Sequence, residues 1–246
     1  MIKNKNVLAI TLARGGSKSV PNKNIKKILG KPLIYYTIKE VLKSKYIDDY
    51  IVSTDSKKIG DIAKKFGAKV PFYRPSKISK DHSPPQEALI HGLELYEEIS
   101  KKKFDYIVEV MCTNPLKNFK DIDNCIEKLD KTGADSVISV QRLYDHHPIR
   151  VKKIKNDRIF NFILTENERI RRQDLKPHAY IRNGSIYAIS RDTLKNKKSK
   201  IGKVSRPYIM PDERSINIDE KIDFLIAELI LKRNKQNAFW EPNKLF

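Results

Sequence analysis

The amino-acid sequence predicts an α/β protein with a Rossmann-like, mostly parallel sheet and helices on both faces. Short apolar runs alternate with stretches of helical periodicity through residue 140, as in chains of strand–helix–strand units. Several of these runs end in polar residues, at the edge where open parallel sheets bind their ligands. The length of 246 residues fits one large domain, and we expect a single domain over residues 1–246.

The first elements follow from local hydrophobic patterning. Residues 7–13 are an apolar run with polar neighbours, which predicts a buried strand. Over 33–42 apolar side chains recur at helical spacing, which predicts a helix. Residues 50–55 predict a second strand that ends in polar side chains. A short helix over 59–66 and a third short strand over 69–73 follow.

The same alternation continues to residue 140. Apolar residues at helical spacing predict a helix over 88–96, and the apolar run 106–111 predicts a fourth strand. A helix over 122–129 ends near Gly133, because glycine readily adopts the left-handed conformation that closes a helix. Residues 136–140 predict a fifth strand.

The pattern changes in the last part of the chain. Residues 141–190 lose the alternation and are typical of a β-rich insertion with extended arms. The stretch 220–232 predicts an amphipathic helix. Its apolar residues on one face are Ile222, Leu225, Ile226, Leu229 and Ile230.

Polar and small residues follow three of the predicted strands. These segments are residues 14–18, 53–55 and 113–115. Because parallel strands end at the same edge of a sheet, the three segments are expected to lie together. The sequence therefore predicts a binding site built from them.

Composition excludes several classes of protein. With 39% hydrophobic and 33% charged residues, the chain fits a globular protein and not a collagen-like or disulfide-rich one. No apolar run approaches the ~20 residues that a membrane span needs, and the first residues lack a signal-peptide cleavage pattern. Two cysteines are too few for a disulfide framework. We expect a cytoplasmic protein without a membrane partner.

The charge balance favours an anionic partner. Fifty basic and thirty acidic residues give a net charge of +20, which attracts nucleic acids, acidic membranes, nucleotides or acidic sugars. The lysines are scattered, and aromatic residues do not alternate with them, so we expect no nucleic-acid partner. A lysine-rich composition that covers solvated helix faces is the alternative explanation.

The strongest local signal is the basic loop after the first strand. Gly15 and Gly16 allow backbone N–H groups to approach a phosphate closely. Arg14, Lys18 and Lys23 would neutralise its charge. The glycine spacing matches neither the Walker A loop nor the dinucleotide fingerprint. A solvated basic loop remains the alternative.

Nearly the whole chain, from about residue 7 to 232, resembles the acylneuraminate cytidylyltransferase family, which makes CMP-activated nonulosonic acids. The matching segments, in chain order, are Ala13-Arg14-Gly15-Gly16-Ser17-Lys18, Pro21-Asn22-Lys23-Asn24, Val52-Ser53-Thr54-Asp55-Ser56, Arg74-Pro75 with Asp81, Thr113-Asn114-Pro115-Leu116-Lys117, His146-His147-Pro148, Arg172-Gln173, Asn183-Gly184-Ser185-Ile186-Tyr187 and Ile216-Asn217-Ile218-Asp219. An ordered set of this kind is far more specific than any one motif.

The resemblance implies a fold like that of nucleotide-diphospho-sugar transferases and a nucleotidyltransferase reaction. The anomeric hydroxyl of a sialic, legionaminic or pseudaminic-like acid would attack the α-phosphate of CTP and release pyrophosphate. Arg14, Lys23 and Asp219 are the expected catalytic residues. The expected nucleotide-binding residues are Arg14, Gly15, Gly16, Ser17, Lys18, Lys23, Asn24 and Arg74. An exposed arginine without a ligand is the alternative for Arg74.

The resemblance also implies Mg²⁺ as the cofactor. Asp219 is the expected carboxylate ligand, and Asn217 stands where the family has its first aspartate of this element. An amide oxygen can still ligate Mg²⁺, but it brings less charge. Asn217 and Asp219 as the cap of the last helix are the alternative role.

On the sugar side, the expected residues are Arg150, Arg172, Asn183 and Tyr187. A guanidinium suits the carboxylate of a sugar acid. Residues 141–190 are expected to form the dimerisation and sugar-side subdomain of a homodimer. Met111 stands where the family's sialic acid enzymes have a glutamine, which favours a sugar other than N-acetylneuraminate. The alternatives are an eight-carbon 3-deoxy sugar acid as substrate and a non-catalytic nucleotide- or RNA-binding protein.

Overall fold

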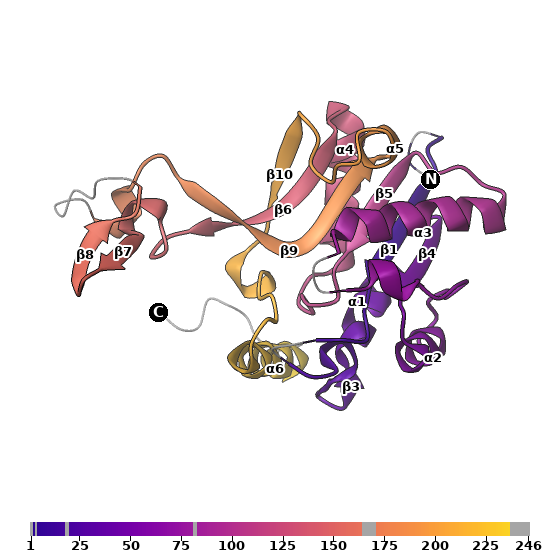
Figure 1. The fold of residues 1–246 in the computed structure, drawn as a ribbon, viewed down its shortest axis with the longest axis horizontal. Helices are drawn as coiled ribbons and strands as arrows, with labels where there is room; N and C mark the ends of the chain where they lie inside the picture. Colours follow the sequence, from indigo (N-terminus) through magenta and orange to yellow (C-terminus); the bar gives the residue numbers. More distant parts are fainter. Residues whose placement is uncertain (1, 3, 18–19, 81–82, 164–170, 237–246) are drawn as a thin grey trace.

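Six strands form the central sheet in the order β10-β6-β9-β5-β1-β4 (Figure 1). They are β1 (Val7–Leu12), β4 (Asp49–Ser53), β5 (Tyr106–Val110), β6 (Ser136–Leu143), β9 (Ala179–Ser190) and β10 (Ser205–Ile209). The pairs β1–β4, β1–β5 and β6–β10 are parallel, and only β9 runs antiparallel to its neighbours β5 and β6. The computed structural model describes residues 2, 4–17, 20–80, 83–163 and 171–236.

Six α-helices and two small ribbons complete the chain. The helices are α1 (Leu33–Val41), α2 (Lys57–Lys65), α3 (Pro85–Ser100), α4 (Phe119–Thr132), α5 (Arg191–Lys195) and α6 (Lys221–Gln236), counted over the residues that the structure describes. The ribbons are β2 (Lys27–Ile28) with β3 (Lys31–Pro32), and β7 (Lys152–Lys155) with β8 (Arg158–Asn161). The expected α/β class with a mostly parallel sheet is confirmed.

The two faces of the sheet bury separate cores, because successive side chains of a strand point to opposite faces. In β1, Val7 and Ala9 pack with α1, α2 and α4. Leu8 and Ile10 point the other way and pack with α3 and α5. All four side chains are completely buried. Helices on both faces therefore follow from an apolar strand that is covered twice.

Helix α4 shows how the local sequence sets the ends of an element. The Asn118 side chain accepts from the Asp121 N–H, and the Asp121 carboxylate accepts from the Asn118 N–H. This reciprocal pair satisfies donors that the first helical turn leaves open. At the other end Gly133 adopts φ 58°, as its expected role as a helix stop requires.

The third short strand expected over residues 69–73 does not form as an element. Only two isolated parallel bridges join this segment to the sheet, from Lys69 to Ile51 and from Tyr73 to Thr54. Pro71 lies between them and has no backbone N–H to donate to a ladder. The prediction of a strand was therefore wrong here, although the segment does run alongside β4.

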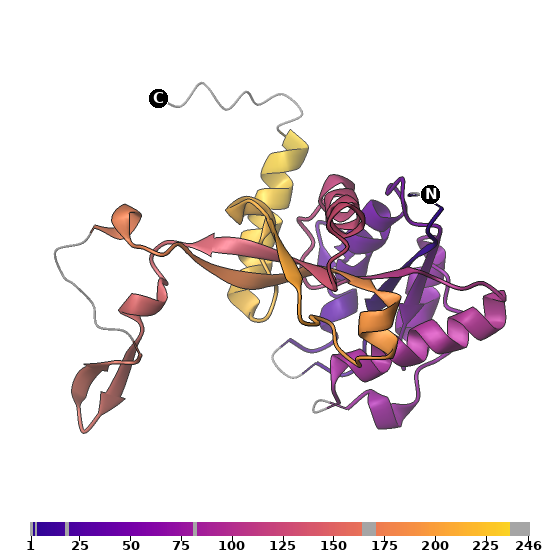
Figure 2. The ribbon, with the colours of Figure 1, turned by 90° about the horizontal axis from the view of Figure 1, so that it is seen from above.

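The insertion expected over residues 141–190 overlaps the central sheet. β6 and β9 pair along most of their length, from Ser136 opposite Ile189 to Leu143 opposite Ala179. The described residues of 144–178 leave the sheet, and Figure 2 shows the β7–β8 ribbon projecting away from the main body. We call the described part of residues 144–178 the arm. The boundaries differ because β9 supplies the strand between β5 and β6.

The last helix, α6, uses a different face from the apolar one that its sequence suggested. Phe224 and Ala227 are buried in a third core with Leu33, Tyr36 and Ile218. Of the expected apolar residues, Ile222, Leu225, Ile226 and Leu229 are exposed. α6 therefore packs along the first helical region of the chain and carries a second, exposed apolar face. Within the described residues, no helix combines the length and apolar character needed to cross a membrane.

Candidate active site

A cleft of about 480 Å³ opens at the carboxyl ends of β1 and β5. Of the three expected segments, 14–18 and 113–115 supply lining residues, whereas 53–55 does not line the cleft and holds the glycine loop through Asp55. The lining from the first half of the chain is Leu12, Arg14, Gly16, Ser17, Lys23, Asn24, Arg74, Ile78, Ser79, Lys80, Ser83, Pro84, Pro85 and Ala88. The remaining lining residues are Glu109, Met111, Cys112, Thr113, Lys200 and Asp219. The cleft thus joins segments from both ends of the chain.

The glycine loop forms one wall of this cleft. Gly15 donates its N–H to the Asp55 carboxylate at 2.8 Å, which ties the loop to the end of β4. A Cβ on Gly15 would lie 3.1 Å from the Cβ of Ser56, so glycine is what allows this close approach. Gly16 and Ser17 line the cleft. Lys18, another expected phosphate ligand, lies outside the described residues, as does Asp81.

Lys23 and Asn24 both line the cleft. Lys23 Nζ donates to the Ile218 carbonyl at 2.7 Å and to Asp219 Oδ1 at 3.1 Å. Asn24 Nδ2 donates to the Arg14 carbonyl at 3.0 Å, and the Cys112 thiol donates to Asn24 Oδ1. Both polar ends of Asn24 are thereby used to hold the loop, so its expected nucleotide contact would be indirect.

Arg74 is buried, not an exposed surface arginine. Its backbone N–H donates to Thr54 O at 2.7 Å, and its Nε donates to Ser79 Oγ at 2.9 Å. Burial lowers the pKa of the guanidinium; Asp55 opposes this shift, and Arg14 adds to it. Two guanidinium groups, those of Arg14 and Arg74, thus face one cleft close to each other, which favours an anionic ligand there.

Asp219 points its carboxylate into the cleft. Its side chain is 68% exposed and pairs with Lys23. The amides of Asp219 and Glu220 donate to Asp223 Oδ2, so the carboxylate that caps α6 belongs to Asp223. Asn217 Nδ2 donates to Asp219 Oδ2 at 2.5 Å. Among the described residues Asn217 Oδ1 is buried without a hydrogen-bond donor.

Of these two residues, Asp219 presents its oxygens to the cleft. Its carboxylate is exposed there, whereas the Asn217 amide oxygen is buried close to Gly184, and Asn217 is not among the lining residues. Mg²⁺ commonly binds through one or two protein oxygens together with substrate phosphates and water. The described residues hold no group of three or more histidine, cysteine or acidic side chains that could bind a metal alone. The site therefore fits a cation that binds together with the phosphates of a ligand.

The turn after β5 is held from inside by a buried ammonium. Lys117 is 2% exposed. Its Nζ donates to Thr37 Oγ1 at 2.8 Å, to the Met111 carbonyl at 2.6 Å and to the Asn114 carbonyl at 2.5 Å. Burial lowers its pKa to about 7, against weaker opposing effects of Cys112 and Asp121. Lys117 therefore fixes the turn that carries Met111, Cys112 and Thr113 to the cleft.

Two of the expected sugar-binding residues lie behind the lining. Asn183 is buried, accepts from Ser139 Oγ at 2.7 Å and donates to Ser215 Oγ at 2.9 Å. Tyr187 is 7% exposed and faces the core between the sheet and α3. Both side chains support the site without lining it. The residue that lines the cleft in front of Tyr187 is Lys200, whose Nζ lies 4.2 Å from the ring centre.

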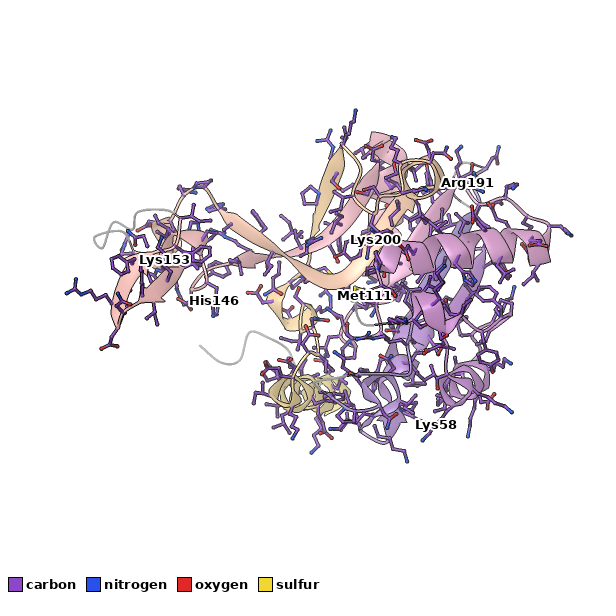
Figure 3. The ribbon with its side chains drawn as sticks, viewed as in Figure 1. Lys58, Met111, His146, Lys153, Arg191 and Lys200 are labelled. Atoms are coloured by element: carbon purple, nitrogen blue, oxygen red, sulfur yellow. The ribbon has the colours of Figure 1, made fainter. Side chains whose placement is uncertain are left out.

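The other two expected sugar-binding residues, Arg150 and Arg172, lie on the arm and not on the cleft of the same chain. Both contact one carboxylate: Arg172 Nη1 donates to Asp145 Oδ2 at 2.8 Å, and Arg150 Nη1 lies 3.8 Å from Asp145 Oδ1. His147 is buried, and its Nε2 lies 2.9 Å from Pro177 O. Figure 3 shows the neighbouring His146 far from Met111.

Sequence reasoning missed Glu109 and Lys200. Glu109 is a carboxylate in the middle of a buried strand, 2% exposed, and forms an ion pair with Lys200. An acidic residue inside the apolar run of residues 106–111 was the signal that could have found it, because a buried charge is costly unless it is paired. Lys200 was hidden in a lysine-rich stretch that suggested a solvated surface.

The cytidylyltransferase family model matches residues 8–240 of the chain. The chain belongs to the cytidylyltransferase family. It is therefore an enzyme of the nucleotidyltransferase class, and the resemblance found from the motifs is confirmed.

Two relatives and one solved structure illustrate the similarity. The chain is 31% identical to the CMP-N,N'-diacetyllegionaminic acid synthase of Legionella pneumophila, over 94% of this chain and 98% of that protein. It is 29% identical to the pseudaminic acid cytidylyltransferase of Campylobacter jejuni, over 94% and 99%. A CMP:2-keto-3-deoxy-manno-octonic acid synthetase complexed with CTP has the same fold, with a TM-score of 0.67, 17% identity, and coverage of 93% and 99%.

Lys117 makes stability depend on pH. Its pKa is 10.5 when unperturbed and about 7 in the folded protein. Between these values the unfolded chain binds more protons than the folded one, so the free energy of unfolding rises with pH. We expect the difference in unfolding free energy between wild type and Lys117→Met to shift in favour of wild type by about 2 kcal/mol from about pH 7 to about pH 9.

Urea unfolding at each pH measures this difference. Lys120→Met is the matched control, because Lys120 is an exposed lysine three residues further on, in the first turn of α4. Its difference from wild type should stay constant with pH. A constant difference for Lys117→Met as well would mean that the buried ammonium keeps its proton throughout this range.

Proposed function

We propose that the protein transfers CMP from CTP to the anomeric hydroxyl of a nonulosonic acid of the sialic, legionaminic or pseudaminic type, with release of pyrophosphate. The observation that carries this proposal is the single cleft in which the glycine loop, two arginines and Lys23 face Asp219. Relatives named for activities of this kind, matched over nearly their whole length, support the substrate class.

The reaction needs negative charge to be stabilised on the departing phosphates. The sugar hydroxyl oxygen loses its proton to solvent and forms a bond to the α-phosphorus. The bond from the α-phosphorus to the bridging oxygen breaks, and pyrophosphate leaves with that electron pair. Arg14 and Lys23 line the cleft and would neutralise the pyrophosphate. The backbone N–H groups of the loop around Gly16 and Ser17 would add hydrogen bonds to phosphate oxygens. Arg74, held by Ser79, would bind a further phosphate oxygen or the base.

We propose Mg²⁺ as the cofactor, held by Asp219 together with the phosphates of CTP, while the expected second ligand Asn217 orients this carboxylate through its Nδ2. When bound, the ion would supply charge stabilisation to the phosphates and orient them. The Lys23–Asp219 pair would then be exchanged, since the ammonium and the cation compete for one carboxylate. Lys23 would be released toward the phosphates that it is expected to neutralise.

We propose a homodimer in which the arm contacts a second copy. The ribbon has no core of its own, and large apolar side chains are exposed along it: Ile154, Ile159 and Ile163 are 72–79% exposed. Arg150 and Arg172 would then serve the partner's cleft. In sedimentation velocity at micromolar concentration we expect a dimer for wild type and a monomer for Ile154→Glu combined with Ile159→Glu. A monomeric wild type would contradict the proposal.

We propose that the enzyme works in the cytoplasm, with CTP and an acidic sugar as its partners. Cys112 and Cys125 are both buried as free thiols. Thiols in this state suit a reducing compartment. The surplus of positive charge would speed the encounter with two anionic substrates.

The proposed reaction is tested by pyrophosphate release from CTP and Mg²⁺ with a panel of sugar acids. The panel contains N-acetylneuraminate, legionaminate, pseudaminate and 3-deoxy-manno-octulosonate, with ATP, GTP and UTP as nucleotide controls. We expect release with CTP and at least one nonulosonic acid, and none with the other nucleotides. Release only with 3-deoxy-manno-octulosonate, or with none of the acids, would overturn the substrate class.

Arg14→Ala serves as the loss-of-function control in this assay. We expect kcat/KM to fall by about 10²-fold or more, because one cation directed at developing charge is removed. Lys58→Ala is the matched variant, since Lys58 is an exposed cation on α2, away from the cleft (Figure 3). Lys58→Ala should retain wild-type turnover.

Asp219→Asn tests the cation site. We expect the Mg²⁺ concentration for half-maximal turnover to rise by about tenfold or more, because the proposed ligand loses the negative charge of its carboxylate. Turnover is measured against Mg²⁺ at a fixed concentration of CTP. Glu220→Gln, which removes the neighbouring exposed carboxylate, should leave the Mg²⁺ response unchanged. An unchanged response for Asp219→Asn would assign the carboxylate to Lys23 alone.

A further inference from the structure

An ion pair between Glu109 and Lys200 lines the same cleft as the glycine loop. The Glu109 carboxylate on β5 forms an ion pair with Lys200 Nζ, and the same ammonium lies 4.2 Å from the centre of the Tyr187 ring. Glu109 and Tyr187 are direct neighbours across the β5–β9 pair, so they support Lys200 from one surface. Glu109 and Lys200 both line the cleft.

The loop that carries Lys200 is fixed by a second carboxylate. Asp135 Oδ2 accepts the backbone N–H groups of Lys203 at 2.7 Å and Val204 at 2.9 Å. Gly202 adopts φ +73°, and a Cβ there would lie 2.3 Å from the Cβ of Asp135, so this approach requires glycine. Ser136 Oγ adds a hydrogen bond to the Ile201 carbonyl at 2.6 Å. Lys200 is therefore preorganised at the cleft.

A buried ion pair contributes little net stability to a sheet, because removing two charges from water costs free energy. Glu109 is 2% exposed, and its neighbours on this face are apolar. Well-packed apolar residues commonly replace a buried ion pair without loss of stability. A pair of this kind that also reaches a cleft has a use besides packing, which is to offer a donor and an acceptor to a ligand.

The position of the pair in the sheet indicates which substrate it meets. The glycine loop follows β1, and Arg74 lies beside the end of β4. Glu109 and Tyr187 belong to β5 and β9, on the other side of β1 in the strand order. Lys200 and Met111 line the same cleft. A nucleotide held by the loop and Arg74 would leave this side for the sugar.

We propose that Lys200 and Glu109 form a sugar-recognition pair that binds a neutral substituent of the acid, a hydroxyl or an acylamino group, and so determine which sugar acid is accepted. This inference rests on the proposed function. Such a substituent both donates and accepts hydrogen bonds, so it can donate to Glu109 while it accepts from Lys200. The sugar carboxylate is excluded from this position, because it would meet the Glu109 charge.

The test compares KM for the sugar and for CTP. In Lys200→Met we expect KM for the accepted sugar acid to rise about tenfold, the worth of one lost polar contact, with KM for CTP within twofold of wild type. Lys203→Met, an exposed lysine of the same loop, is the matched control and should change neither value. An unchanged KM for the sugar, or an equal rise for both substrates, would overturn the proposal.

Lys200→Met leaves Glu109 buried without its partner, so its stability must be separated from its specificity. Glu109→Gln combined with Lys200→Met removes both charges and should bring the melting temperature back toward that of wild type. KM for the sugar should remain raised in this double variant. If the double variant restores both the melting temperature and KM for the sugar to their wild-type values, the pair is structural, and the proposal fails.

The outcome for wild type distinguishes this inference from the proposed function. If wild type releases no pyrophosphate with any nonulosonic acid, the proposed function fails, and the recognition pair fails with it. If wild type is active and Lys200→Met shows wild-type KM values, only the recognition pair fails.

Discussion

The backbone of Ile218 is the point on which the cleft depends. Its N–H donates to the Thr113 carbonyl at 2.7 Å, and its carbonyl accepts from Lys23 Nζ at 2.7 Å. Its side chain is completely buried in the core that α6 shares with α1. One residue therefore joins the glycine loop, the turn after β5 and the final helix. Asp219 follows directly, so the position of its carboxylate is set by these three contacts.

The layered fold could be predicted from the sequence because local patterns determine it. The continuous apolar run Val7 to Leu12 indicates a strand that is buried on both faces of a sheet. Gly133 ends α4 because glycine readily adopts the left-handed conformation. Residues 69–73 do not form the strand that their strand propensity predicts, because Pro71 has no backbone N–H to donate to a neighbouring strand. β9 could not be placed in the middle of the sheet, because nothing local states which strands it pairs with.

The candidate site was predictable where residue type and chain position coincide. Arg14, Lys23 and Asp219 meet in one cleft, as the motifs indicated. Asn183 and Tyr187 lie behind the cleft lining, and a motif alone does not distinguish a residue that lines a cleft from one that lies behind it. Lys200 could not be predicted from the sequence, because its place at the cleft depends on the ion pair with Glu109, 91 positions earlier. Only the folded chain brings these two residues together.

Lys23 contacts Ile218 across a sequence separation of 195 residues, so the cleft is completed by a segment that is synthesised long after the glycine loop. The two cores beside β1, β4 and β5 also contain Ile186 and Leu194, which follow these strands in the chain. A growing chain on the ribosome therefore completes neither the cores nor the cleft until these later segments emerge. A chain truncated before residue 217 would lack both Asp219 and the backbone carbonyl that holds Lys23.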